Sequence, residues 1–186
     1  FFNVTTIIST TGLANTDFTK WPAAAQAILF SCYLVGGMVG STAGGPKILR
    51  FVVSAKYIVA KVRNLLTGKK SHRFEIDGVR YNEESASMIV ISVLIYLMVF
   101  LAGGLGIMIV SNHNVLPDGT IKEMDFTSAI TASIANLGNI GPAAQVGNIN
   151  AGPAGNYFAY SPEAKIIMSI LMLIGRIGVI TILMMF

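Results

Sequence analysis

The chain has 186 residues, of which 53% are hydrophobic and only 12% are charged, and its mean hydropathy is +0.66. Soluble domains usually carry about 25% charged residues, and disordered chains are far less apolar than this one. The composition therefore excludes a disordered chain and argues against a soluble globule, which leaves an integral membrane protein. A single cysteine and two isolated histidines exclude an intrachain disulfide framework and indicate no metal site built on those side chains.

The first 66 residues predict a short helix, an irregular turn and a long helix that is broken in its middle. Residues 1–11 are apolar but too few to span a bilayer, so they predict a re-entrant helix, followed by an irregular turn over 12–16. A helix over 22–66 is interrupted at 36–46, where five glycines and a proline exclude regular helix. Irregular backbone at membrane depth must be surrounded by protein or line a water-filled cavity, which indicates a polar pathway.

The charges are distributed unevenly along the chain. Residues 47–80 hold nine of the thirteen basic residues and only two acids, whereas residues 111–125 hold three acids and one lysine. Basic runs also bind nucleic acid, but this one lies between apolar stretches, where the excess of Lys and Arg in cytoplasmic loops explains it. We therefore expect residues 67–85 to form a basic cytoplasmic loop, the acidic segment to lie on the opposite face, and no nucleic acid to bind.

The rest of the chain predicts a second set of the same elements. Residues 86–110 contain no charge, and at about 1.5 Å each they are long enough to span a hydrocarbon core of about 30 Å. A short helix over 125–136 and an irregular segment over 137–143 follow. A last helix is expected over 162–186, because a serine, a proline and an acid stand at its start. The expected fold class is an all-α integral membrane protein with a weak internal repeat and re-entrant pore loops.

The two irregular turns have the composition of a cation filter. A re-entrant helix points its C-terminal end, with free carbonyls and a partial negative charge, into the membrane. Carbonyl oxygens can replace the hydration shell of a cation, and glycine lets successive carbonyls point the same way. For Gly12 and Gly141 the alternative is close packing of helices against a small residue. The candidate filter residues are Thr10, Thr11, Gly12, Leu13, Asn139, Ile140 and Gly141.

Four short segments stand out along the chain. They are Ser9-Thr10-Thr11-Gly12 with Thr16-Asp17-Phe18, Gly40-Ser41-Thr42-Ala43-Gly44-Gly45-Pro46-Lys47, Asn139-Ile140-Gly141-Pro142, and Gly175-Arg176 with Thr181. In composition, order and spacing they resemble the Trk/Ktr/HKT superfamily of potassium transporters, and the likeness covers nearly the whole chain. Pro46 stands where that family usually has isoleucine and Ala143 where a glycine is common. Together with Gly178, these residues leave the TrkH-like and KtrB-like membrane subunits both open.

The resemblance implies a pore of four repeats, each with a spanning helix, a pore helix and a second spanning helix. Residues 1–66 would be the third repeat without its first helix and residues 86–186 the complete fourth, so the chain would cover the C-terminal half. Potassium, or sodium as the alternative ion, would bind the backbone carbonyls of Thr11, Gly12, Ile140 and Gly141. The gate would consist of Gly40, Ser41, Thr42, Ala43, Gly44, Gly45 and Arg176, for which a simple hinge and a structural arginine are the alternatives.

The resemblance also implies a cellular setting. We expect a multi-pass protein of a prokaryotic inner or plasma membrane that conducts potassium, catalyses no reaction and holds no cofactor in this chain. Its expected partners are lipid, the N-terminal half of the pore, a second copy in a homodimer, and a cytosolic nucleotide-binding regulatory subunit of the TrkA or KtrA type. That subunit would dock on the basic residues 61–80. The alternative is a non-transporting membrane scaffold or assembly subunit with vestigial pore loops.

Overall fold

The structure is a computed structural model that describes residues 1–67, 74–76, 79–111, 114–115, 121–122, 124–146 and 149–178. Within these residues it contains the helices α1 (Phe2–Ile8), α2 (Ala23–Val35), α3 (Ile48–Thr67), α4 (Glu83–Val110), α5 (Phe126–Leu137) and α6 (Pro162–Ile177), with a 3-10 turn at Phe18–Lys20. Three antiparallel hairpins pair β1 (Phe74–Ile76) with β2 (Val79–Tyr81), β3 (Asn114–Val115) with β4 (Ile121–Lys122), and β5 (Gln145–Val146) with β6 (Ile149–Asn150). The packed body is helical, as the sequence predicts, while the hairpins, which were not expected, are confined to connections between helices.

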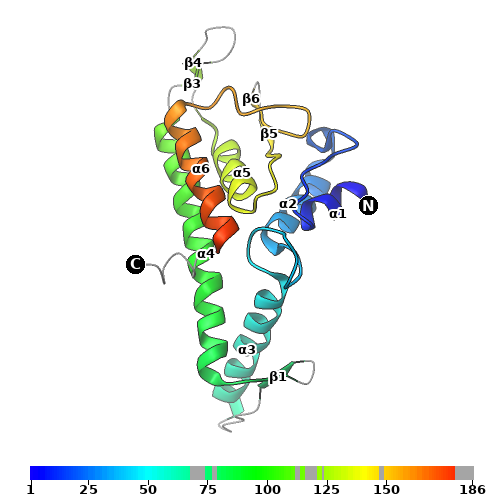
Figure 1. The fold of residues 1–186 in the computed structure, drawn as a ribbon, viewed down its shortest axis with the longest axis vertical. Helices are drawn as coiled ribbons and strands as arrows, with labels where there is room; N and C mark the ends of the chain where they lie inside the picture. Colours follow the sequence, from blue (N-terminus) through cyan, green and yellow to red (C-terminus); the bar gives the residue numbers. More distant parts are fainter. Residues whose placement is uncertain are drawn as a thin grey trace.

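Helix α4 is the central helix of the fold, against which three other helices pack. It has 28 residues, and α5 and α6 lie against one half of it and α3 against the other (Figure 1). Large apolar side chains are exposed along it at every third or fourth position: Met88, Ile91, Leu94, Met98, Leu101, Leu105 and Ile109. Among the described residues, α4 alone is both long and apolar enough to cross a membrane, and only 28% of its most apolar window is buried. A core helix of a soluble protein is mostly buried, so this exposed apolar face fits lipid.

A glycine lets α5 and α6 pack closely on the other face of α4. A Cβ added at Gly103 would lie 2.8 Å from both the Leu171 side chain of α6 and the Ser133 hydroxyl of α5. That hydroxyl donates a hydrogen bond to the Phe100 carbonyl of α4 at 2.8 Å. Small residues and hydroxyl-to-carbonyl bonds are the usual means by which helices associate in lipid. The contact therefore fixes the short helix α5 beside two longer ones.

Polar side chains explain where the last two helices start. The Asp125 carboxylate accepts a bond from the Thr127 N–H at 2.9 Å at the start of α5. The Ser161 hydroxyl accepts one from the Ala164 N–H at 3.2 Å at the start of α6, where Pro162 occupies the first turn. Such caps satisfy amide groups that the first turn of a helix leaves free.

Two helices end earlier than the sequence predicts. Helix α1 stops at Ile8 rather than at residue 11, because Thr10 turns into the left-handed region with φ +55°. Helix α6 ends at Ile177, where Gly178 has φ +94°, so the helix expected over 162–186 is interrupted there. Residues 179–186, which include Thr181, lie outside the described residues.

The hairpins on either side of α4 lie at opposite ends of the molecule. The β1 hairpin lies at the end where α3 meets α4, and β3 and β4 lie beyond the far end of α4 (Figure 1). At the first end Lys61 of α3 forms an ion pair with Glu83 of α4. The described parts of the basic segment and of the acidic segment thus lie at opposite ends of α4, which is the arrangement that a membrane-crossing helix requires.

Candidate functional site

Two loops follow the short helices, residues 9–13 after α1 and residues 138–142 after α5, and their backbones have the same shape; we call them the first and second pore loops after the role that the sequence predicts for them. In each loop two residues separated by one position are left-handed: Thr10 (φ +55°) and Gly12 (φ +76°) after α1, and Asn139 (φ +55°) and Gly141 (φ +100°) after α5. This conformation is uncommon outside glycine and is most unusual for a β-branched residue such as threonine. Asparagine and glycine adopt this conformation readily, so Thr10 is the strained member of the four, and the two loops share a backbone shape that their sequences reach with different residues.

The same hydrogen bonds close both loops onto the helices before them. The N–H groups of Thr11 and Gly12 both donate to the carbonyl of Thr6, at 2.8 and 3.4 Å. In the second loop Ile140 and the glycine after it donate to the carbonyl of Ala135, at 2.9 and 3.3 Å. The loops differ at the next residue. In the first, the Leu13 N–H donates to the Thr6 hydroxyl at 3.0 Å, whereas the second has a proline and an alanine at these two positions.

The two loops touch each other at a glycine. A Cβ added at Gly12 would lie 2.1 Å from the carbonyl oxygen of Ile140, a distance that no side-chain carbon can occupy. Gly141 differs, because a Cβ added there would meet nothing within 4 Å and only its positive φ favours glycine. The candidate filter residues therefore come together from two segments that are far apart in the sequence.

Two tyrosines reach the second loop from other parts of the chain. The Tyr157 hydroxyl donates to the Gly141 carbonyl at 2.5 Å, and the Tyr33 hydroxyl of α2 donates to the Pro142 carbonyl at 2.8 Å. The Gly141 carbonyl, which the sequence suggests as an ion ligand, is therefore already engaged by a hydroxyl. Sequence reasoning missed both tyrosines, and the only signal available was that Tyr157 lies in a long uncharged segment.

The glycine-rich loop over 36–47 lies directly against both pore loops. The Gly44 N–H donates to the Thr10 hydroxyl at 3.2 Å, which fastens it to the first pore loop. A Cβ added at Gly44 would lie 2.6 Å from the carbonyl oxygen of Gly138, just before the second pore loop. The residues expected to form a gate are thus in contact with the residues expected to form a filter.

Two cationic side chains hold this loop by its carbonyls. Lys47 Nζ donates to the carbonyls of Ser41 at 2.9 Å and Ala43 at 2.6 Å. The Arg176 guanidinium of α6 donates to the carbonyl of Thr42, which lies between them. The sequence singles out Arg176 but not the matching arrangement of Lys47. Positive charges placed here oppose the approach of another cation.

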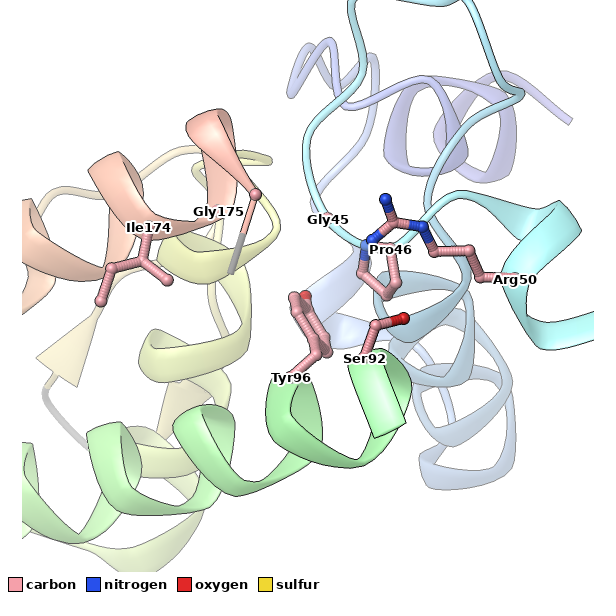
Figure 2. Close-up of a pocket in the computed structure, with 8 residues that line it drawn as sticks. Gly45, Pro46, Arg50, Ser92, Tyr96, Ile174 and Gly175 are labelled. Carbon is pink, nitrogen blue, oxygen red and sulfur yellow. The ribbon is translucent and has the colours of Figure 1, made fainter. Parts of the chain in front are cut away.

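A small pocket separates the loop from the helices beside it. It is lined by Gly45, Pro46, Arg50, Ser92, Tyr96, Ile174, Gly175 and Gly178. Figure 2 shows the hydroxyls of Tyr96 and Ser92 on α4, with the Arg50 side chain lying beside Pro46 of the loop. Tyr96 is 3% exposed, and its hydroxyl has no hydrogen-bond partner within the described structure. The pocket has a volume of about 20 Å³, which is room for about one water molecule.

Replacing Thr10 with valine tests the link between the first pore loop and the glycine-rich loop. Valine keeps the β-branched shape but removes the hydroxyl that accepts the Gly44 N–H. We expect cation flux through the complete native protein to rise severalfold, because the loop loses an anchor worth about 1 kcal/mol. Tracer-ion uptake into liposomes measures this, with Thr67→Val, at the exposed end of α3, as the matched control. An unchanged flux in Thr10→Val would argue against a movable loop.

Comparison with known proteins decides which family this chain belongs to. The family model of TrkH, described as a cation transport protein, matches residues 1–186. The chain belongs to the TrkH family. This membership confirms the resemblance drawn from the four segments, and the family itself is described as one of cation transport proteins.

Relatives of the TrkH chain include two bacterial potassium uptake proteins and one solved structure. It is 31% identical to the Trk system potassium uptake protein TrkI of Halomonas elongata, over 98% of this chain and 34% of that protein. It is 26% identical to the Trk system potassium uptake protein TrkH of Escherichia coli, over 100% of this chain and 35% of that protein. The crystal structure of the potassium transporter TrkH from Vibrio parahaemolyticus matches with a TM-score of 0.78 and 24% identity, over 96% of this chain and 34% of that one. That likeness shows the same fold.

The chain spans about a third of the length of these relatives, less than the half that the resemblance implied.

Proposed function

We propose that this chain contributes two pore loops to a potassium pathway across a bacterial inner membrane. The observation that carries the proposal is the contact between two loops of the same left-handed backbone shape, where Gly12 meets the Ile140 carbonyl. Backbone carbonyls on such loops can replace the water around a monovalent cation. The relatives named as potassium uptake proteins support potassium as the main ion, with sodium as the alternative.

The carbonyls proposed to face the ion are those of Thr11, Gly12 and Ile140. The Gly141 carbonyl is a weaker candidate than the sequence suggests, because the Tyr157 hydroxyl already donates to it. In this proposal residues 1–66 and 86–186 are the third and fourth of four repeats around one pore. The same proposal implies a multi-pass membrane protein, in which the first and second repeats come from outside these residues.

The loop over 36–47 is proposed as the gate. Its support is the set of contacts that Thr10 and Arg176 make with it, those that Lys47 makes within it, and the small pocket beside it. Such polar contacts can break and form again when a loop changes position. A guanidinium beside the ion path would in addition raise the electrostatic barrier to a cation.

The proposed assembly is a homodimer that carries a cytosolic nucleotide-binding subunit of the TrkA or KtrA type. The described part of the basic segment offers Lys56, Lys61 and Arg63 on α3, at the end of the molecule that we assign to the cytoplasm. Basic residues beside a membrane also favour anionic lipid, so lipid headgroups are a second proposed neighbour of this surface.

Potassium-limited growth separates a transporter from a non-transporting scaffold. The complete native protein is expected to restore growth of a bacterium that lacks its own potassium uptake systems, and Gly141→Ser is expected to abolish the rescue. A Cβ has room at this position, so the loss would come from the positive φ together with the hydroxyl that serine, unlike alanine, brings beside the loop carbonyls. Gly106→Ala is the matched control, since its added carbon would make an ordinary contact 3.6 Å from Ile167. Failure of the unmodified protein to restore growth would favour the scaffold.

A further inference from the structure

The two pore loops differ in what holds them from outside. Two successive carbonyls of the second loop, those of Gly141 and Pro142, accept hydrogen bonds from tyrosine hydroxyls at 2.5 and 2.8 Å. The corresponding carbonyls of the first loop belong to Gly12 and Leu13, and within the described residues no side-chain hydroxyl donates to them. The second loop is therefore tied at two points where the first is not.

Both tyrosines are held in place by their surroundings. Tyr33 is 1% exposed, and its ring packs against Phe30 of the same helix at a centroid distance of 5.0 Å. The Tyr157 ring packs against the Tyr160 ring at 5.3 Å, and the Tyr160 hydroxyl donates to the Ser128 carbonyl of α5 at 3.2 Å. The donors that reach the second loop therefore come from side chains that can move little.

The two donors also come from different parts of the fold. Tyr33 lies on α2, in the first set of elements, and Tyr157 lies in the connection that leads to α6. The Gly141 carbonyl can tilt through ψ of the glycine, which no Cβ restricts, although Pro142 fixes the next φ and so prevents a flip of the whole peptide. A hydrogen bond to that carbonyl removes this freedom at Gly141, where an added Cβ would meet nothing within 4 Å.

We infer that Tyr157 and Tyr33 are positioning residues that set the ion preference of the pathway by fixing the backbone of the second pore loop. The inference rests on the proposed function. With the Gly141 peptide fixed, the neighbouring Ile140 carbonyl keeps its distance from the opposite loop, and the space for a cation has one size. Without the hydroxyl the Gly141 carbonyl is free to tilt, and the site adapts to the smaller sodium ion as well as to potassium.

The test is Tyr157→Phe in the complete native protein, reconstituted into liposomes. The measured quantity is the ratio of potassium flux to sodium flux under matched gradients. We expect the ratio to fall by roughly 3- to 10-fold, the range that corresponds to loss of one hydrogen bond. Tyr160→Phe is the matched control, because it removes the neighbouring hydroxyl, which bonds to the body of α5 rather than to the loop.

Two further measurements decide the outcome. The thermal unfolding midpoint of each variant shows whether the substitution destabilises the fold. Such destabilisation would lower the midpoints of Tyr157→Phe and Tyr160→Phe alike. Tyr33→Phe removes the second donor and carries the same test if Tyr157→Phe does not accumulate in the membrane. An unchanged flux ratio in Tyr157→Phe, or an equal fall in Tyr160→Phe, overturns the inference while leaving potassium transport intact. Absence of potassium flux in the unmodified protein instead overturns the proposed function.

Discussion

Replacing Gly12 with alanine is expected to remove most of the potassium uptake of the complete native protein. The added carbon would lie 2.1 Å from the Ile140 carbonyl oxygen, so the two pore loops must separate. The positive φ of +76° adds about 1–3 kcal/mol of backbone strain. The two effects act on the same contact, so uptake of a potassium tracer should fall by at least about tenfold, which corresponds to 1.4 kcal/mol.

Gly141→Ala separates the two causes. Alanine has room at Gly141, so this variant carries the backbone strain without the collision. We expect it to lose less uptake than Gly12→Ala, while Gly106→Ala behaves like the unmodified protein. Equal losses in Gly12→Ala and Gly141→Ala would mean that contact between the loops is unimportant.

Replacing Arg176 with alanine is expected to increase cation flux severalfold. The change removes both a donor to the Thr42 carbonyl and a positive charge beside the proposed path. Flux measured in liposomes at a fixed potassium gradient gives the size of the increase. A decrease in flux, with the protein present and folded, would contradict a barrier at this position.

Two further variants divide the effect of Arg176 between its charge and its hydrogen bond. Arg176→Lys keeps the charge but not the planar guanidinium, and Arg176→Gln keeps a donor but not the charge. If the charge forms the barrier, Arg176→Lys retains low flux and Arg176→Gln does not. If the bond to Thr42 holds the loop closed, the glutamine variant retains low flux to the extent that its shorter side chain reaches that carbonyl.

Features that depend on local composition could be predicted from the sequence. Five glycines and a proline within eleven residues exclude helix wherever they occur, so the break between α2 and α3 needed no knowledge of the fold. The start of α6 was equally local, because its serine cap and first-turn proline act within a single helical turn. The end of α6 was missed, since one glycine among apolar residues gave no reason to stop there.

Features that depend on packing could not be predicted. The relative placement of α1 and α5 brings Gly12 against the Ile140 carbonyl oxygen. No pattern along the chain predicts how close these two residues lie. The same holds for the bond from Tyr157 to the Gly141 carbonyl, since a tyrosine in an uncharged loop has many possible partners. Lys47 belongs to the basic run and ends the glycine-rich segment, but neither pattern predicts that its side chain donates to two carbonyls of that segment.

The two pore loops differ at the residue after their glycines, which is Leu13 in the first loop and Pro142 in the second. This difference limits the order in which such loops can change during evolution. In the first loop the Leu13 N–H and the Thr6 hydroxyl satisfy each other, and in the second a proline and Ala135 leave neither group to satisfy. Leu13 is 63% exposed and Thr6 only 7%, so losing the threonine first leaves an amide on a residue that water reaches, whereas losing the amide first leaves a hydroxyl on a buried residue. One backbone shape therefore has two chemical solutions, and the easier route between them changes the threonine first.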